Sequence, residues 1–591
     1  MEYAGFQNYP DPSPWSEETY IKDNDGNKLY ETEWCELKIR ILERNDIAML
    51  KRYMTVYGIG TLAPADSQTS DPFWVAAANG STDTLRFLLE KYVSDPVHQK
   101  EWPLEVRGFS LLSVTCSHPH VETVKCLLDS RMPVWKVNER DLHGRTALLN
   151  AAESLFSEVP SKSLRDPEVD GYQWIEERVN AAEELILFLL EKGSSVQEAD
   201  FGPQPPDEKN QGQSRKELER AIVSWTSFVL SCGVTDEQPQ QPIGTVLGGV
   251  VSRGGYSLVK RLLDDGANIL ARQRYIGHIG RLSKSSNSIT GVTAFHLTSL
   301  FWNANGLKAL IDYCGESGVS NAKELLRSCD DGGRWPIHWA TAGPGSSECE
   351  LLENNISDRL EATLRLLLSN SPESVNVQDK EGYTPLYHLL ASHASCVRRK
   401  HFDIALKHLL ENGAKTGILT VQNYNALHIV SLYRPEHKLI DNSLLDILAK
   451  HGADINQPDK DGNTPLHLMA SNLRQSEAAK FLLGQGASIS STNTKGDTAY
   501  HQLMQSSFLP GQTIDHRRYI TPTFEEKIKA QDEMLSVLQE AAHRDDMMDQ
   551  PNAAGRTPRQ LRSETRSKWQ IMGARHPLRR GGRWNHQDKA S

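Results

Sequence analysis

Residues 459–471 read DKDGNTPLHLMAS, and residues 476–489 read SEAAKFLLGQGASI. Thr464 and Pro465 suit the start of a helix, because a threonine accepts hydrogen bonds from the free N–H groups and proline fits the first helical position. The second stretch repeats apolar residues at helical spacing and ends before Gly486. Glycine lets a chain leave a helix through positive φ, so the two stretches predict a pair of short helices.

This pattern closely resembles one complete ankyrin repeat, and the resemblance recurs with decay along most of the chain. One such repeat cannot bury its apolar face alone, so neighbours must stack. The resemblance therefore implies an all-α ankyrin-repeat solenoid of stacked helix pairs with short hairpin tips. The family period is about 33 residues, and longer intervals predict insertions. The positions equivalent to Thr464 are Asp71, Ser110, Thr146, Thr245, Thr293, Trp335, Thr384, Asn425, Thr498 and Thr557.

Polar insertions divide the repeats into blocks. Ala181–Lys192 is predicted to be the second helix of the repeat begun at Thr146, displaced by an insertion that begins at Ser154, and Arg220–Cys232 a further helix. Cys35–Tyr57 has the same helix, turn, helix rhythm and is expected to form a leading cap. The predicted segments are an irregular N-terminal segment (1–34), a first block of repeats (35–153), a repeat with long polar insertions and a linker (154–244), the main block of repeats (245–504), a linker and helix (505–550), a terminal ankyrin-like cap (551–572) and a disordered basic tail (573–591).

Several histidines fall at the position that bonds the hairpin turn in the resembled family, and we interpret them as structural. In the repeat of Thr245 this position is taken by Gly248. Threonine is replaced by Asp71, Trp335 and Asn425 in three repeats, which are expected to be looser or differently packed. The structural histidines are His296, His338, His428, His467 and His501.

Motifs for catalysis, metals or cofactors are not recognisable in the sequence. His118 and His120 form a compact pair but lack Cys or carboxylate ligands at the usual zinc spacing. The stretch GTVLGGVVSRGG at 244–255 has no Lys-Ser/Thr ending suited to a phosphate. The strings typical of serine hydrolases, zinc proteases and kinases do not occur. We therefore predict a chain that is not an enzyme and has no cofactor and no metal.

Composition indicates an ordinary water-soluble chain, with 38% hydrophobic and 24% charged residues. No stretch approaches the roughly 18 apolar residues that a membrane span needs, so no membrane association is expected. The first ten residues carry no basic region followed by an apolar run, which favours an intracellular location, cytoplasmic or nuclear. Eight cysteines without a C-x-x-C pair suit reduced, packed thiols.

Charge is unevenly distributed along the chain. Residues 552–591 contain ten Lys or Arg against two acidic residues, a net of +8, whereas the whole chain carries −11, which leaves −19 for the rest. The segment Arg575–Trp584 suits either nuclear import and phosphate contact or a solvated tail. Direct, sequence-specific binding of nucleic acid is not expected, because the body is acidic and no DNA-reading module is recognisable.

In the ankyrin family the hairpin tips and first helices form a concave surface that contacts partner proteins, and the resemblance implies the same surface here. Tyr383 and Tyr424 on adjacent repeats offer large amphipathic contact area. An open strip suits a protein or an extended peptide better than a small molecule. The alternative is that the tips are polar merely because they face water. The candidate contacts are Arg140, Leu142, His143, Arg145, Asp331, Arg334, Gln378, Lys380, Glu381, Tyr383, Tyr424, Lys460, Asp461, Asn463, Thr494, Lys495 and Asp497.

Three functions are consistent with these features. The first is a scaffold or adaptor that binds another protein. The second is a nuclear transcriptional co-regulator, for example of biosynthetic genes, that acts through a DNA-binding partner such as a transcription factor, as some fungal members of the resembled family do. The third is a catalytic or ubiquitin-ligase subunit, which would need an added domain. Only the first 34 residues and about 505–550 are unassigned, and neither holds a recognisable ligase-recruiting box.

Overall fold

The computed structural model divides the chain into two compact units, described one at a time below. The first unit comprises mainly residues up to 331, and the second mainly residues from 332 onward. The described residues are 19–31, 36–58, 70–101, 104, 110–129, 136–141, 144–155, 171–200, 242–276, 288–344, 356–393, 399–432, 439–506, 511–512, 519–520, 523–542 and 546–575.

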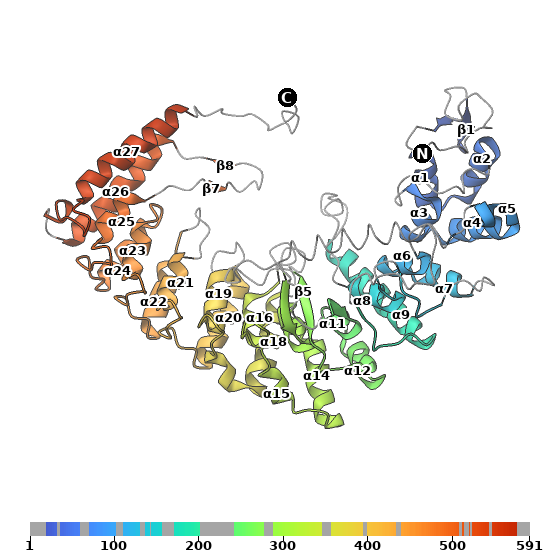
Figure 1. The fold of residues 1–591 in the computed structure, drawn as a ribbon, viewed down its shortest axis with the longest axis horizontal. Helices are drawn as coiled ribbons and strands as arrows, with labels where there is room; N and C mark the ends of the chain where they lie inside the picture. Colours follow the sequence, from blue (N-terminus) through green and yellow to red (C-terminus); the bar gives the residue numbers. More distant parts are fainter. Residues whose placement is uncertain are drawn as a thin grey trace, which may run out of the picture. The chain divides into compact units, whose positions relative to one another are not determined.

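The first unit consists of helix pairs with three short antiparallel strand pairs, β1–β2, β3–β4 and β5–β6, among its described residues (Figure 1). Its strands are β1 (Tyr20–Lys22), β2 (Lys28–Tyr30), β3 (Ala199–Asp200), β4 (Gly244–Thr245), β5 (Gln273–Ile276) and β6 (Ser288–Val292). Its helices are α1 (Glu36–Glu43), α2 (Ile47–Tyr57), α3 (Pro72–Ala78), α4 (Thr82–Ser94), α5 (Pro96–Glu101), α6 (Leu111–Ser117), α7 (Val121–Asp129), α8 (Ala147–Glu153), α9 (Gly171–Glu191), α11 (Val246–Val250), α12 (Tyr256–Asp264), α13 (Ala294–Leu300), α14 (Ala304–Ser317) and α15 (Ala322–Leu326).

The second unit continues the same rhythm of paired helices. Its elements are α16 (Pro336–Ala342), most of α18 (Ile356–Asn370), the 3-10 turn η5 (Pro372–Asn376), α19 (Pro385–His393), α20 (Arg399–Glu411), α21 (Ala426–Leu432), α22 (Asn442–Lys450), α23 (Pro465–Ala470), α24 (Ser476–Gly484), α25 (Ala499–Gln505), the strand pair β7 (Gly511–Gln512) and β8 (Tyr519–Ile520), α26 (Phe524–Ala542), η6 (Asp546–Met548) and α27 (Pro558–Arg575).

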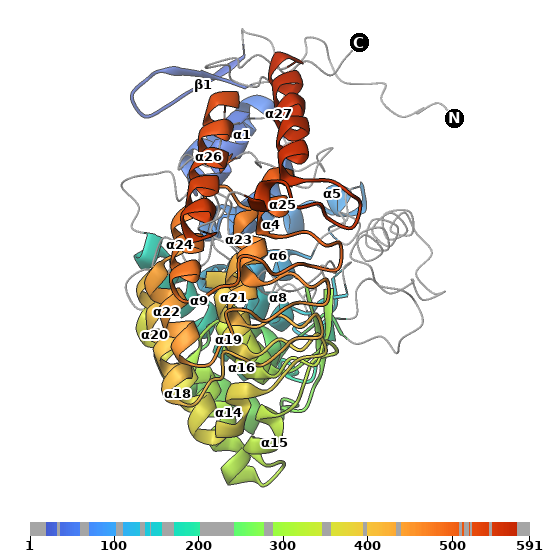
Figure 2. The ribbon, with the colours of Figure 1, turned by 90° about the vertical axis from the view of Figure 1, so that its left-hand side faces the viewer.

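Successive helix pairs stack within each unit. In the second unit the first helices α16, α19, α21, α23, α25 and α27 contact one another in chain order, and the second helices α22, α24 and α26 do the same. Figure 2 shows this arrangement, with α20, α22 and α24 in one row, α21 and α23 in the next, and the hairpins on the far side. The prediction of an all-α solenoid of stacked helix pairs is confirmed.

The N-terminal segment departs from the prediction that residues 1–34 are irregular. β1 and β2 pair as an antiparallel hairpin, and the buried Glu31 connects it to the helices. The Glu31 carboxylate accepts the N–H groups of Leu37 at 2.9 Å and Lys38 at 3.0 Å, and the hydroxyl of Tyr53 donates to it at 2.7 Å. Glu31 therefore satisfies free N–H groups at the start of α1, which a helical pattern alone does not reveal.

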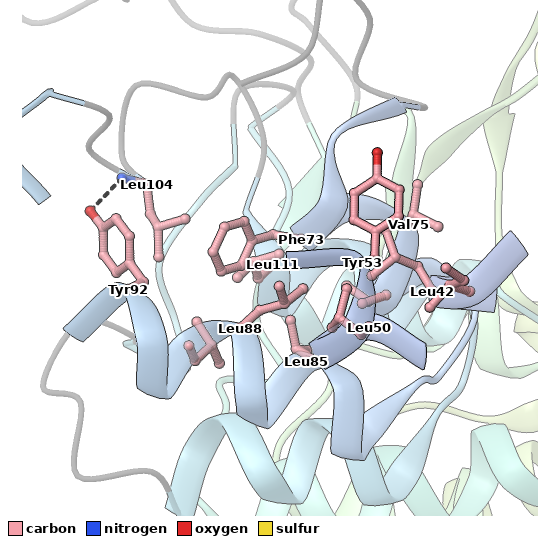
Figure 3. Close-up of a cluster of buried hydrophobic side chains, with 14 of the residues drawn as sticks. Leu42, Leu50, Tyr53, Phe73, Val75, Leu85, Leu88, Tyr92, Leu104 and Leu111 are labelled. Carbon is pink, nitrogen blue, oxygen red and sulfur yellow. Dashed lines mark hydrogen bonds between the residues drawn. The ribbon is translucent and has the colours of Figure 1, made fainter. Parts of the chain in front are cut away.

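Below this hairpin lies an apolar core shared by α1 to α4 (Figure 3). Leu42, Leu50, Tyr53, Phe73 and Leu88 are each at most 1% exposed. Helices α1 and α2 fall where the sequence predicts the leading pair, and their buried residues extend the core of the next pair. A leading cap of this kind removes the apolar end that a stack of repeats would otherwise expose.

Two long helices flank the insertions that the sequence predicts. α9 packs on α8, so the second helix of that repeat lies where Ala181–Lys192 was expected, with ten more residues at its N-terminus. α26 packs on α24 and α25, so the helix expected within 505–550 is a second helix of the stack. The predicted helix at Arg220–Cys232 lies outside the described residues.

Buried histidines join neighbouring repeats in the second unit. The Nδ1 of His467 accepts the N–H of Thr464 at 3.1 Å, and its Nε2 donates to the carbonyl of Asp497 in the next repeat at 3.1 Å. A backbone N–H only donates and a carbonyl only accepts, so the ring is neutral with its proton on Nε2. The predicted structural role is confirmed for His467 and for the equivalent rings, His338 to Tyr383, His428 to Asn463 and His501 to Arg556.

The repeat that lacks this histidine receives a side chain from elsewhere. The Oε1 of Gln273, in β5, accepts the N–H of Thr245 at 3.1 Å and its hydroxyl at 2.8 Å. A Cβ at Gly248 would lie 2.1 Å from that oxygen, so glycine leaves the room that the amide occupies. Gln273 is 5% exposed and thus fills the histidine position from the following hairpin.

Two of the three residues that replace threonine, Asp71 and Asn425, still cap their helices. The Oδ1 of Asp71 accepts the N–H of Phe73 at 2.9 Å, and the Oδ1 of Asn425 accepts the N–H of Leu427 at 3.1 Å. Asp and Asn are among the preferred caps for this geometric reason. Neither repeat therefore loses the capping contact, and the expected loosening does not arise at these two positions.

A second link between repeats uses asparagine and was not predicted from the sequence. The Nδ2 of Asn456 donates to the carbonyl of Gly486 at 3.1 Å, and its Oδ1 accepts the N–H of Ser488 at 2.7 Å. The amide thus bonds two backbone groups just after the second helix of the next repeat. Asn138 and Asn376 make the same pair of contacts, to Gly193 and Ser195 and to Gly413 and Lys415.

We predict that His467→Ala lowers the free energy of unfolding by about 1–3 kcal/mol, because it leaves the Thr464 N–H and the Asp497 carbonyl without their partner. His467→Gln is expected to cost less, since an amide also offers one acceptor and one donor, as Gln273 does. Urea denaturation of the full chain measures both.

His451→Ala is the control for this series. His451 is exposed, and its Nδ1 contacts the carbonyl of Ile447 in its own helix. Its substitution is expected to change stability by less than about 0.5 kcal/mol. Equal losses for His451→Ala and His467→Ala would contradict the structural role assigned to the buried ring.

Candidate functional site

The hairpin tips of the second unit are built alike. In the tip at 459–463 the Oδ1 of Asp459 accepts the N–H groups of Asp461 at 2.9 Å and Asn463 at 2.7 Å. Gly462 sits at φ 79°, a backbone conformation that glycine adopts at little cost. Asp379, Asn493 and Asn552 hold their own tips through the same two contacts.

Backbone hydrogen bonds join these tips into a continuous row, which we call the tip strip (residues 379–383, 420–424, 459–463, 493–497 and 552–556). Each tip donates one N–H to a carbonyl of the tip before it, at 2.9 to 3.0 Å. The donor and acceptor pairs are Lys380 to Gly332, Val421 to Glu381, Lys460 to Gln422, Thr494 to Asp461 and Ala553 to Lys495. The tip strip is therefore a pre-ordered surface rather than a set of independent loops.

Most of the predicted contact residues reach solvent. In the tip strip Lys380, Glu381, Lys460, Asp461, Thr494 and Lys495 are exposed, and Tyr424 and Asn463 are partly exposed. Just outside it Gln378 is exposed and Arg334 partly exposed. In the first unit Arg140 and Asp331 are exposed, Arg145 is partly exposed, and Leu142 and His143 lie outside the described residues. Exposure leaves these residues available but does not assign them a partner.

Two predicted contacts are buried, and the prediction is wrong for them. Tyr383 is 5% exposed, and its ring packs edge-on against His388 with centroids 6.1 Å apart. Asp497 is 2% exposed, and its carboxylate accepts hydrogen bonds from amide groups on neighbouring elements, including Asn552 at 2.7 Å. Both follow the tip glycine directly, but the Tyr383 ring packs within its own repeat, whereas the Asp497 carboxylate also contacts the next tip.

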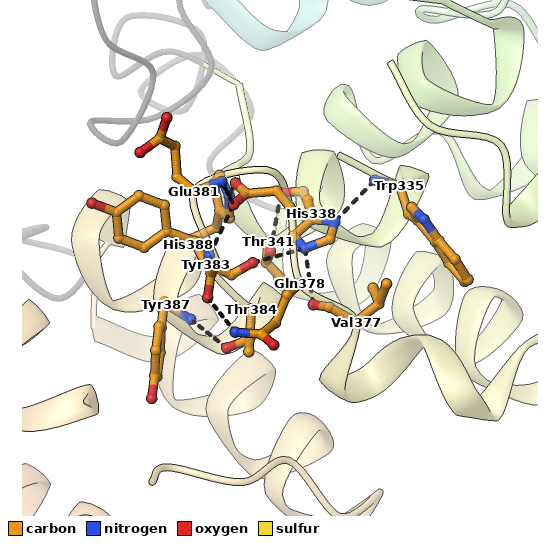
Figure 4. Close-up of polar contacts among 12 residues, drawn as sticks. Trp335, His338, Thr341, Val377, Gln378, Glu381, Tyr383, Thr384, Tyr387 and His388 are labelled. Carbon is orange, nitrogen blue, oxygen red and sulfur yellow. Dashed lines mark hydrogen bonds and ion pairs between the residues drawn. The ribbon is translucent and has the colours of Figure 1, made fainter. Parts of the chain in front are cut away.

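A buried acid–imidazole pair supports the first tip of the strip (Figure 4). The Oδ2 of Asp379 lies 3.0 Å from the Nε2 of His388, and the two side chains are 6% and 2% exposed. Burial acts to raise the pKa of Asp379, but the hydrogen bond from His388 and the nearby imidazoles hold that pKa below its usual value. The ring of His338 lies 5.2 Å away, so the pair also contacts the repeat before it. Its role is to hold the tip in place.

Among the described residues no group of three or more His, Cys, Asp or Glu is placed so that it could hold a metal ion. The Nε2 of His120 contacts the carbonyl of Ala78 at 2.9 Å, and the Nδ1 of His118 contacts that of Val114 at 3.0 Å. One nitrogen of each ring therefore already contacts a backbone carbonyl. A search of the described helices for a stretch long and apolar enough to cross a membrane finds none.

Part of the chain matches a known protein family. A family model described as ankyrin repeats, in three copies, matches residues 395–493, which include the tips at 420–424 and 459–463. The chain contains ankyrin repeats. Ankyrin repeats form protein-interaction domains, and two of the five tips of the tip strip lie wholly within the matched region.

Individual relatives cover only part of the chain. Human transient receptor potential cation channel subfamily A member 1 is 27% identical over 183 residues, which is 31% of this chain and 14% of the channel. Ankyrin repeat protein nuc-2 of Neurospora crassa is 27% identical over 175 residues, 29% of this chain and 13% of that protein. This chain thus spans only about a seventh of each relative.

Among solved structures, the ankyrin repeat domain of Bcl-3, a member of the IkappaB protein family, is similar to part of this chain. The match has 17% sequence identity and a TM-score of 0.30, and it covers 46% of this chain and 97% of the Bcl-3 domain.

Acidification is expected to destabilise the second unit. Burial lowers the pKa of His428, His467 and His501 below 6.5. In the unfolded chain these rings take up protons near pH 6.5, so unfolding binds protons there. Their stabilising effect is complete above about pH 7 and is lost as the pH falls through 6.5 toward the lower folded pKa. The urea midpoint should therefore be lower at pH 5.5 than at pH 7.5.

A triple variant with His428, His467 and His501 changed to Gln is the matched test. It removes the titrating groups while keeping an amide acceptor and donor, so its midpoint should depend less on pH. Asp379, whose pKa is lowered, contributes only as the pH falls below about 4 and does not interfere. An unchanged pH dependence in the triple variant would show that other groups are responsible.

Proposed function

We propose that this chain is a scaffold or adaptor without enzymatic activity that binds another protein through the ankyrin surface of its second unit. The surface consists of the tip strip and the adjoining first helices. The observation that carries the proposal is the row of hydrogen bonds between tips, which fixes five neighbouring tips in one register. A surface ordered before binding loses little conformational entropy when a partner arrives.

The chemistry of the strip supports a protein partner. Tyr424 is partly exposed and Val421, in the same tip, is 46% exposed, so they offer apolar contact area at its centre. Lys380 and Lys460 occupy equivalent positions on the two neighbouring tips. Aromatic residues at the centre with charged residues at the rim are typical of protein interfaces.

The variant Tyr424→Ala with Lys460→Ala is expected to lose the principal partner, because it removes a central contact and a rim charge without touching the buried histidines. Affinity purification of the tagged full chain followed by mass spectrometry identifies the partner, and titration with that purified partner should show binding weakened about tenfold or more.

The control carries Lys407→Ala and Lys450→Ala on the second helices α20 and α22, where both lysines are about 71–72% exposed. The control should bind as the unmodified chain does. A partner that is retained by the tip variant and lost by the control would place the binding surface on the second helices and reject the proposal.

A second candidate is a nuclear transcriptional co-regulator that acts through a DNA-binding partner, and the basic C-terminal region favours it. Much of the described basic charge there is already paired within the unit: Arg556 with Glu564, Arg559 with Asp549, and Arg562 and Arg566 with Asp532. The basic residues that remain for import are therefore mainly those of residues 576–591, such as Arg579, Arg580 and Arg583.

Deletion of residues 576–591 tests this second candidate. The deletion leaves α27 complete, so the fold of the second unit should be retained. The co-regulator proposal predicts that the fluorescently tagged chain is nuclear and that the deletion reduces its nuclear fraction. A tagged chain whose distribution is unchanged by the deletion removes the observation that favours this candidate.

A further inference from the structure

The first helices of the second unit are free of charged residues until the last repeat. α16, α19, α21, α23 and α25 contain no Asp, Glu, Lys or Arg. The second helices α20, α22, α24 and α26 each contain at least two. These five first helices are thus uncharged, although 24% of the residues of the chain are charged.

Several uncharged side chains of these first helices reach solvent. Positions four residues after the cap hold Leu468 and Gln502, both partly exposed. Positions seven residues after the cap hold Leu432, which is 39% exposed, the partly exposed Ser471 and the exposed Gln505. Because α21, α23 and α25 pack side by side, residues at equivalent positions lie on one surface. We call this surface, with Tyr424 at its edge, the neutral face.

The carboxylate next to this face is covered. The Oδ2 of Asp497 accepts hydrogen bonds from the Nε2 of Gln502 at 3.4 Å and of Gln505 at 3.3 Å, and Asn552 donates to its Oδ1. Asp497 is 2% exposed, so its charge is surrounded by amide donors. Each glutamine turns its donor group toward Asp497 and keeps its Oε1 as an acceptor.

We propose that the neutral face binds an extended, uncharged peptide segment of a partner protein, in which apolar side chains contact Leu432 and Leu468 and backbone N–H groups donate to Gln502 and Gln505. This inference rests on the proposed function and names the chemistry of the partner. A charged side chain set against this face would lose part of its water and meet no opposite charge on the described residues of α21, α23 and α25, which disfavours its binding there.

The glutamine acceptors favour an extended segment over a helix. Inside a helix the N–H groups are already bonded to carbonyls of the same helix. An extended segment presents free N–H groups to one side at every second residue, with alternate side chains available for the leucines. Neighbouring first helices lie about 8–10 Å apart, so the face from α21 to α25 accommodates roughly six extended residues.

The test uses a phage-displayed library of random 12-residue peptides, selected against the full chain. Selected peptides are synthesised, and their dissociation constants are measured by fluorescence anisotropy at 50 and 500 mM NaCl. We expect the shared core of these peptides to lack Asp, Glu, Lys and Arg, and the dissociation constant to change less than about twofold with salt.

Two variants locate the bound peptide. Leu432→Glu with Leu468→Glu places charge on the neutral face and should weaken binding at least tenfold, whereas Lys460→Glu with Lys495→Glu changes only tip charges and should stay within twofold. Leu432→Ser with Leu468→Ser is a milder form for use if the glutamates disturb the fold, which circular dichroism and thermal melting report. Three outcomes would each overturn the proposal. They are selected peptides that are charged and bind in a salt-dependent way, peptide binding that neither leucine variant weakens, and a selection that yields no peptide.

The same variants separate this inference from the proposed function. A purified protein partner that is lost with the tip-charge variant and retained by the leucine variants leaves the scaffold proposal standing and rejects the neutral face. A partner that is unaffected by the tip-charge, Tyr424 and leucine variants rejects both. A partner that is lost with the leucine variants and bound independently of salt supports both.

Discussion

The second unit depends on a neutral imidazole placed between the start of one repeat and the tip of the next. Buried backbone groups must be bonded, and each junction leaves one N–H donor and one carbonyl acceptor facing the same small space. A neutral imidazole supplies the matching acceptor and donor on opposite sides of one rigid ring. His428, His467 and His501 do so with the N–H of their own cap and with the carbonyl that precedes the cap of the next repeat. The ring thereby fixes both the helix start and the position of the neighbouring tip.

Where a repeat lacks the histidine, another side chain bonds the backbone groups at the junction. Tyr387 takes the histidine position in one repeat, and its hydroxyl donates to the carbonyl of Thr416 at 3.0 Å in the next. The imidazole in that repeat lies one residue later, at His388, where it bonds Asp379 instead. In the repeat of Thr245 the amide of Gln273 arrives from a different element. Different side chains are therefore accepted where they pair the backbone groups that the junction leaves open.

Local motifs predicted the helix pairs, the caps and the histidine contacts, because each depends on residues a few positions apart in a repeating frame. Contacts between repeats could not be predicted from the residue pattern within one repeat. Gln273 fills the space at Gly248 only through the β5–β6 hairpin, and Glu31 reaches the start of α1 from a strand. Tyr383 and Asp497 stand at tip positions in the sequence, yet both are buried. Asp497 is contacted by Asn552 of the next tip, a neighbour that the pattern of a single repeat does not contain.

The proposed function depends on the hydrogen bonds that hold the tips in a fixed order. Since the tips share one hydrogen-bonded row and the first helices α16 to α25 beside them are uncharged, the surface proposed for partner binding is fixed and has neutral and charged parts. The charge state of the buried rings tests this account most directly, and nitrogen-15 spectra of histidine side chains recorded from pH 8 to 5 report it. The account predicts that His428, His467 and His501 keep the proton on Nε2 and titrate below the ordinary value of about 6.5. Rings that titrate near 6.5, or that carry the proton on Nδ1, would contradict it.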